Sequence, residues 1–422
     1  RSVSGKPLLA SDPHLHGSRL PGPWYFAHLS TPGLDVAGSF FPGLPTALIG
    51  HNRNIAWGIT NMGPDVQDLF IEEPNPDDDT QYMYLEEWLE FEIIPQTIRI
   101  KDSEQEDGFR IKEFEIRKTI HGPIVKEDEE LLALSWTGHQ FNGEMEAFYR
   151  LNHAQDWGEF SLALSHFSTA PQNFVYADVD GNIGYYGAGK VPIRKSGSGV
   201  FPVPGWSGEF DWEGYIPFED MPHIYNPEGG MIVSANAEPY SSDYPYPMPG
   251  VYAPEYRTRR IKDLLESKEK LSLDDMATFQ FDRKSYLAPI FLKYLVPVIP
   301  ESQQDVRNLM EVWDHELDPN GVEGSIYHET METFLRLIWV DDMGLELAEK
   351  YLDTWYISLN RWVKMLEDNE NPWYDMVETS VLETRDVLLL EAFETAMTSL
   401  EQKFESDDFK TWEWGGIHKI AF

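Results

Sequence analysis

The spacing of apolar and polar residues changes along the chain. From Glu90 to Trp136, apolar and polar residues alternate in short runs separated by acidic or glycine-containing turns. A period of two is typical of strands with one buried face. The segment from Asn173 to Gly189 alternates around Asp180-Gly181, a dipeptide that favours a hairpin turn. The first half of the chain is therefore predicted to consist mainly of antiparallel strands.

The second half follows a different pattern. Proline and glycine recur from Val200 to Pro254, which predicts ordered loop because proline lacks the N–H that a central strand needs. Beyond Arg257 the apolar residues follow a helical period through about Gln402, and Ser272 to Asp275 form a capping box at a helix start.

These patterns predict three regions. Residues 1–256 are expected to be β-rich, residues 257–410 mostly helical, and residues 411–422 the start of a strand that returns to the first region. Because this last region stops on strand-like sequence, the chain is expected to be truncated at its C-terminal end. Because Arg1 to Ala10 lack the apolar run of a signal peptide, a preceding segment is expected to be absent as well, so that the chain is truncated at both ends.

Composition narrows the function classes. The 72 acidic residues against 33 basic ones give a formal charge of −39, which repels nucleic acid and anionic membranes. No run approaches the roughly 18 apolar residues of a membrane span. The absence of cysteine excludes disulfides, thiolate metal sites and a cysteine nucleophile.

Three segments carry residues suited to chemistry. His14 and His16 are spaced to share a metal ion on one strand face, as in a metal-dependent amidohydrolase, although a structural role is the commoner one. Asp65 and Asp68, with Gln67 between them, offer oxygen ligands to a hard cation such as Ca²⁺. Asn236 follows an apolar run, and its amide suits either an oxyanion donor or a turn cap.

Several motifs in a fixed order resemble the penicillin acylase family of N-terminal-nucleophile hydrolases. They are SGKPLLASDPHL, PGLPTALIGHNRNIAWGITN, HGPIV, YADVDGNIGY, PVPGW, NPEGGMIVSAN and YRTRRI. The resemblance covers nearly the whole chain. It implies an α+β fold of four αββα layers, with the helices after Arg257 forming an excursion.

The resemblance also implies a mechanism. In that family a serine exposed by self-cleavage of a precursor attacks the amide carbonyl, and its own α-amine acts as the base. The family places this serine upstream of the present chain, so neither Ser2 nor Ser4 is expected to be the nucleophile, and the chain alone is expected to be inactive. An α chain from the same precursor is the expected partner, in the periplasm or outside the cell.

The resemblance also implies which residues of this chain belong to the active site, because they occupy matching positions in the motifs. The resemblance makes the side chain of Asn236 and the backbone N–H of Asn61 the oxyanion donors. His14 is expected to orient the serine amine. Arg257 is expected to support Asn236 or steer the substrate, with a surface helix arginine as the alternative.

The resemblance gives further residues a binding role. Asp65, Gln67 and Asp68 match structural calcium ligands. Leu15 and Ile49 fall where the acyl pocket is lined, which favours an aliphatic acyl group; core packing would explain either residue equally.

Three readings compete with an acylase. The metal-dependent amidohydrolase would use His14 and His16. An acidic, aromatic-rich carbohydrate-binding protein or glycosidase would explain the 14 Trp and the acidic composition. A homologue that keeps only the scaffold would lack the upstream serine.

Overall fold

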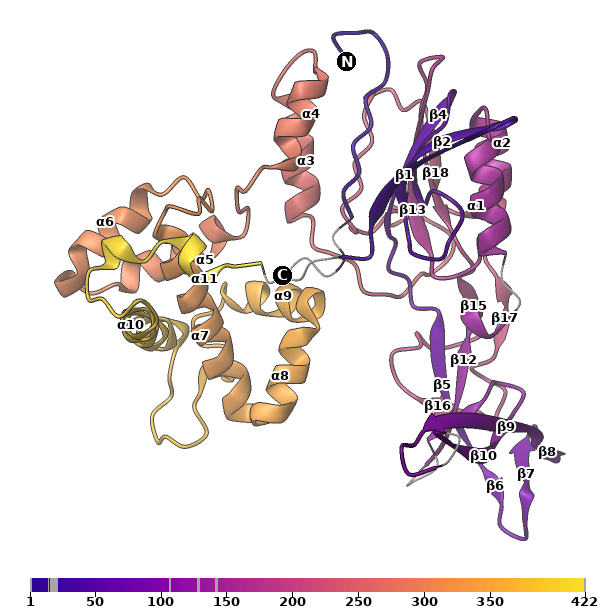
Figure 1. Cartoon of the computed structure of the whole chain (residues 1–422). Coiled ribbons are helices and arrows are strands. Elements are labelled where there is room, and N and C mark those ends of the chain that lie inside the picture. Colours follow the sequence, from indigo (N-terminus) through magenta and orange to yellow (C-terminus); the bar gives the residue numbers. More distant parts are fainter. Residues whose placement is uncertain are drawn as a thin grey trace. The chain divides into compact units, whose positions relative to one another are not determined.

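The structure, a computed structural model, describes residues 2–13, 15, 22–105, 108–126, 130–140 and 143–420. Its contacts divide the chain into two compact units. Figure 1 shows the whole chain, coloured from the N-terminus to the C-terminus. The sheet unit is Phe26–Glu228 with Glu238–Val251. The helical unit is Arg1–Tyr25, Gly229–Ala237 and Tyr252–Phe422.

The main sheet of the sheet unit contains seven strands within the described residues. In spatial order they are β1 (Tyr25–Thr31), β2 (Leu34–Phe40), β3 (Ile49–His51), β4 (Ile55–Asn61), β13 (Gln172–Asp178), β14 (Ile183–Ala188) and β18 (His223–Tyr225). Helices α1 (Glu144–His153) and α2 (Trp157–Leu164) lie against it (Figure 1). Trp157 of α2 packs edge-on against Tyr176 and stacks on Tyr225, which fixes the helix to the sheet.

Smaller sheets extend from this one. One has the order β11 (Ile124–Lys126), β12 (Leu131–Trp136), β5 (Gln67–Glu72) and β16 (Val203–Pro204), and β16 runs parallel to β5. The others are β9 (Glu92–Lys101) with β10 (Phe109–Lys118), β15 (Pro192–Arg194) with β17 (Trp212–Tyr215), and β6 (Pro74–Asn75), β7 (Asp78–Tyr84) and β8 (Glu87–Glu90).

The helical unit has its own aromatic core, in which Phe291, Phe334 and Trp362 are fully buried. Its helices are α3 (Tyr256–Glu266), α4 (Leu273–Gln280), α5 (Ala288–Val298), α6 (Gln304–Val312), α7 (Glu323–Met343), α8 (Leu345–Asp353), α9 (Trp355–Met365), α10 (Arg385–Phe404) and α11 (Trp414–Ile417). In the part of the chain that the structure describes, no helix is long and apolar enough to cross a membrane.

Local sequence signals predicted several elements correctly. β13 and β14 pair antiparallel around Asp180-Gly181, where Gly181 has a φ of 110°. Ser272 caps α4 and makes a reciprocal capping box with Asp275. β9 and β10 pair antiparallel within the region from Glu90 to Trp136 that was expected to form such strands. In each case the residues that decide the conformation are close in sequence.

Two features differ from the prediction. The strands of the first half are interrupted by α1 and α2, which the alternating pattern did not indicate. The strand predicted from residue 411 is wrong for the described residues up to 420, because Trp414 begins the short helix α11. The backbone N–H groups of Trp414 and Gly415 donate to Gly321 and Pro319, so packing against the helical core overrides the local pattern.

The boundary near residue 256 corresponds to the start of α3 at Tyr256. The boundary between the two compact units is different, because the chain passes to the helical unit at Gly229, returns to the sheet unit at Glu238 and leaves it again at Tyr252. Gly229–Ala237, which carries Asn236, belongs with the helices, although its sequence is continuous with the β-rich region.

Candidate active site

Asn236 lies in the helical unit in a left-handed backbone conformation, with a φ of 65°. Asparagine tolerates this conformation better than most residues. Its carbonyl oxygen accepts a hydrogen bond from the backbone N–H of Ala253 at 2.8 Å. This bond ties the backbone of the half-buried Asn236 to the segment at Ala253.

Arg257, the second residue of α3, reaches the same loop. Its Nη2 donates to the carbonyl oxygen of Ala235 at 3.0 Å and to Oδ1 of Asn236 at 2.9 Å. The same nitrogen lies 2.8 Å from the hydroxyl of Tyr356 on α9. The structure thus brings together Asn236 and Arg257, two residues that the sequence predicted for one site, and adds Tyr356, which it did not predict.

The contact with Arg257 orients the Asn236 amide. Because a guanidinium only donates, the amide atom beside it is the accepting oxygen. The Nδ2 end, which can only donate, then points elsewhere. This is the orientation that a donor to a developing negative charge requires.

Asn61 ends β4 in the sheet unit and is exposed. Its side-chain oxygen accepts from Nε2 of Gln172 at 3.0 Å, and its backbone oxygen accepts from Nδ2 of Asn173 at 3.0 Å. Both partners lie on the neighbouring strand β13. The backbone at Asn61 is therefore fixed by the sheet.

Asp65, Gln67 and Asp68 lie at the entry to β5. Gln67 begins the strand, and its N–H donates to Oδ1 of Asp65 at 3.0 Å. Burial raises the pKa of Asp65. Asp68 is buried, and both of its carboxylate oxygens accept hydrogen bonds from Arg194, at 2.8 Å from Nε and 2.7 Å from Nη2.

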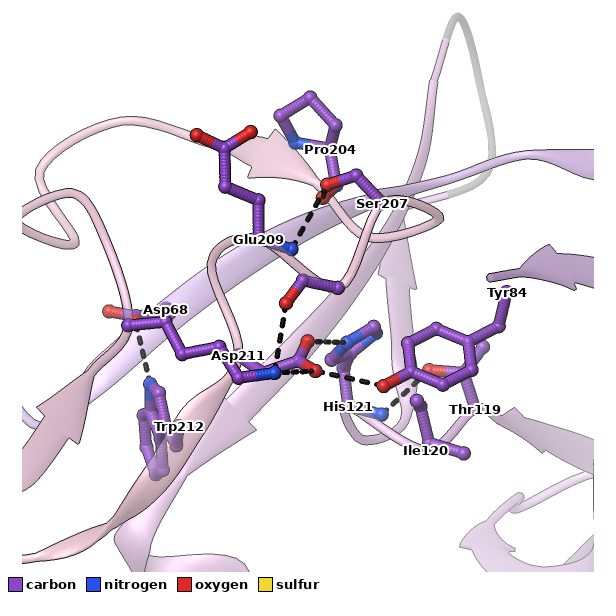
Figure 2. Close-up of polar contacts among 12 residues, drawn as sticks. Asp68, Tyr84, Thr119, Ile120, His121, Pro204, Ser207, Glu209, Asp211 and Trp212 are labelled. Carbon is purple, nitrogen blue, oxygen red and sulfur yellow. Dashed lines mark hydrogen bonds and ion pairs between the residues drawn. The ribbon is translucent and has the colours of Figure 1, made fainter. Parts of the chain in front are cut away.

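Figure 2 shows the indole of Trp212 directed at the same carboxylate, with Nε1 2.6 Å from Oδ2 of Asp68. Within the described ranges, no three His, Cys, Asp or Glu side chains are placed to hold a metal ion. In this arrangement the three residues do not fit a calcium ion, because the Asp68 carboxylate already binds a cation of the protein.

The remaining predicted residues fall in different surroundings. Ile49 lies in β3 and is 9% exposed, as a core residue is, whereas Leu15 is 37% exposed. His14 and His16 lie outside the described residues. Ser2 forms a backbone bridge with Leu271, and its hydroxyl donates to the carbonyl oxygen of Lys6.

A family profile described as penicillin amidase matches residues 1–422. The chain belongs to the penicillin amidase family. Among curated relatives, it is 26% identical to the acyl-homoserine lactone acylase QuiP of Pseudomonas syringae pv. syringae, over 99% of this chain and 53% of that protein. It is 31% identical to the penicillin acylase 2 proenzyme of a Pseudomonas species, over 82% of this chain and 45% of the relative.

The fold of this penicillin amidase family member agrees with a solved structure. A thermostable penicillin G acylase from Alcaligenes faecalis superposes with a TM-score of 0.76 at 22% identity, covering 95% of this chain and 76% of that one. The predicted α+β N-terminal-nucleophile hydrolase fold is thereby confirmed. The chain spans about half the length of the curated relatives that it matches.

Sequence reasoning missed one buried polar cluster in this penicillin amidase family member, of which Figure 2 shows His121 and Asp211. His121, of the HGPIV motif, places Nδ1 2.8 Å from Oε1 of Glu72 and Nε2 3.3 Å from Oδ1 of Asp211. The ring stacks on Phe70 with centroids 4.0 Å apart. Glu72, His121 and Asp211 are distant in sequence and meet only in the tertiary structure. The HGPIV motif therefore helped to indicate the family but did not reveal which residues His121 contacts.

Proposed function

We propose that the complete protein hydrolyses a linear amide bond through an acyl-enzyme formed on a serine upstream of this chain. The match to the penicillin amidase family over the whole chain supports this proposal. The names of its relatives, acyl-homoserine lactone acylase and penicillin acylase, supply the substrate classes. The observation that carries it is the contact between Arg257 and Oδ1 of Asn236.

The proposed reaction has two steps. The serine hydroxyl attacks the amide carbon, and the α-amine of the same serine takes the hydroxyl proton. The tetrahedral intermediate collapses, its C–N bond breaks, and the proton passes to the leaving amine. Water then attacks the resulting ester, releases the acid and restores the serine hydroxyl.

Asn236 and Asn61 are the proposed donors to the oxyanion, the first through Nδ2 and the second through its backbone N–H. Arg257 holds the Asn236 amide in the donating orientation. Donors that are fixed before the reaction stabilise the developing charge without reorganising during it.

His14 is proposed to orient the serine amine. Leu15 and Ile49 are proposed to line the acyl pocket, which favours an aliphatic acyl group. The exposed Leu15 is suited to contact a ligand directly, while Ile49 would act through the shape of the core.

The serine is proposed to become an N-terminus by cleavage of a precursor that also supplies an α chain. The printed name of one relative, a proenzyme, supports processing. A periplasmic or extracellular location is proposed with it.

The test begins with the complete gene product. Intact mass and N-terminal sequencing of the purified protein should give two chains, the second starting with serine a short distance before Arg1. The purified protein should then release amine from penicillin G or from a long-chain acyl-homoserine lactone. Replacement of that serine by alanine should leave one unprocessed chain.

Two results would reject the proposal. An unprocessed wild-type polypeptide without activity would indicate the scaffold homologue. Activity that survives loss of the serine but not a chelator would indicate the metal-dependent amidohydrolase with His14 and His16.

A further inference from the structure

An ion pair is buried in the sheet unit between residues 126 positions apart. Arg194, at the end of β15, and Asp68, in β5, have side chains that are 5% and 3% exposed. Nε of Arg194 lies 2.8 Å from Oδ2 and 3.1 Å from Oδ1, and Nη2 lies 2.7 Å from Oδ1. This is the bidentate geometry in which two N–H groups of a guanidinium each donate to one oxygen of a carboxylate.

The pair joins further segments. Nη2 of Arg194 also donates to the backbone oxygen of Asp65 at 3.2 Å, and Nε1 of Trp212 on β17 donates to Oδ2 of Asp68 at 2.6 Å. One cation thus connects the segment before β5 with β5 itself and with the β15–β17 ribbon. Such a joint is what a bound structural cation provides, with carboxylate and carbonyl oxygens as its ligands.

A glycine closes the loop over this pair. Gly199 has a φ of 78°, and a Cβ there would lie 2.3 Å from Oδ1 of Asp68 and 2.7 Å from Nη2 of Arg194. The backbone therefore packs directly on the paired charges. The space around the Asp68 carboxylate is filled by protein atoms.

We infer that Arg194 takes the position of the structural calcium that the family resemblance assigns to Asp65, Gln67 and Asp68. Calcium needs direct contact with carboxylate oxygens at about 2.3–2.6 Å. Both oxygens of Asp68 are bound by Arg194 and Trp212. The joint is closed by a cation of the protein itself and needs no divalent ion. This inference does not depend on the proposed catalytic function.

The experiment compares thermal unfolding of the complete purified protein with excess EDTA and with millimolar CaCl₂. For the wild-type protein the two midpoints should agree within about 1 °C, because an ion that does not bind the folded state cannot shift its stability. Elemental analysis should find no stoichiometric calcium. A fall on chelation, or one bound calcium that EDTA removes with a lower midpoint, would overturn the inference.

Substitutions of Arg194 test whether the buried positive charge at this position stabilises the fold more than an exposed ion pair does. Arg194→Gln should lower the midpoint by roughly 5–15 °C, because it leaves a buried carboxylate uncompensated, and Arg194→Lys should lower it less. Arg53→Gln, which removes an exposed arginine paired with Asp35, should change it by only about 1 °C.

Arg194→Ala vacates the space between Asp68 and the carbonyl of Asp65. Millimolar CaCl₂ should raise the midpoint of this variant and leave the wild type unchanged. A variant that ignores calcium would show that Arg194 is only an ion-pair partner and would refute the inference. If the glutamine and alanine variants do not fold, Arg194→Lys and the wild-type response to EDTA still decide it.

Discussion

Nη2 of Arg257 lies 2.9 Å from Oδ1 of Asn236 and donates a hydrogen bond to it. The two residues are 21 positions apart and come from a loop and from the first turn of α3. The contact gives the Asn236 amide one orientation, with its donor end directed away from the guanidinium. The first two predictions follow from this contact.

Replacement of Asn236 should lower turnover without preventing processing of the chain. Asn236→Gly removes the amide and keeps a residue that accepts the φ of 65°. We expect kcat to fall by roughly 10²–10³ with little change in KM, as for other lost oxyanion donors. Asn236→Ala should lose as much activity and also about 1 kcal/mol of stability, because alanine is strained at this φ. Unchanged kcat in both variants would refute the donor role.

Replacement of Arg257 should act through Asn236. Arg257→Gln should lower kcat by about 10-fold to 100-fold, since hydrogen bonds from charged groups contribute roughly 1.5–3 kcal/mol. Tyr356→Phe, which removes one partner of the same nitrogen, should have a smaller effect in the same direction. Arg259→Gln is the control, because Arg259 lies two residues along α3 and pairs with Glu255 on the exposed surface. Equal effects of Arg257 and Arg259 would contradict the assignment.

Asp211 should contribute to stability in a pH-dependent way. Burial raises the pKa of Asp211, but hydrogen bonds from Tyr84, Lys195 and His121 outweigh burial and hold the pKa below its ordinary value of 3.8. A carboxyl whose pKa is lowered by folding stabilises the protein above its unfolded pKa and loses this contribution as the pH falls through the folded pKa.

Asp211→Asn should therefore cost roughly 1–3 kcal/mol at neutral pH. The difference from wild type should shrink below about pH 4, and thermal unfolding followed from neutral to acidic pH measures it. Glu213→Gln, an exposed change two residues further along the chain on β17, should leave the profile unchanged. A gap that persists to the lowest pH would exclude ionisation of Asp211 as its source.

Gly122 should tolerate no side chain. It has a φ of 144°, and a Cβ would lie 1.9 Å from the backbone oxygen of Leu134, so alanine adds a clash with the sheet to the strain at this φ. Gly122→Ala should lose roughly 3 kcal/mol or more. Gly181→Ala is the matched control, because its φ is 110° and its Cβ would meet no atom within 4 Å.

The control should lose only about 1–2 kcal/mol through backbone strain. Urea unfolding of both variants gives the comparison. Equal losses of unfolding free energy in the two variants would show that the clash between a Cβ at position 122 and the Leu134 oxygen does not contribute.

The sequence by itself determined the features that depend on neighbouring residues. The hairpin at Asp180-Gly181 and the capping box of Ser272 were predictable because their hydrogen bonds join residues a few positions apart. The ordered motifs also identified the family and hence the fold. The motifs indicated Asn236 and Arg257 as site residues but did not show that the two side chains form a hydrogen bond.

Only the tertiary structure decided the rest. Asp68 was a predicted calcium ligand on local grounds, but its partner Arg194 lies 126 positions away on another strand. The cluster of Glu72, His121 and Asp211 is distributed over the chain in the same way. The helix α11 replaced a predicted strand because its backbone bonds to residues near 320. Local pattern fixes what a segment can form, whereas partners distant in sequence decide what a buried charge or a short segment contacts.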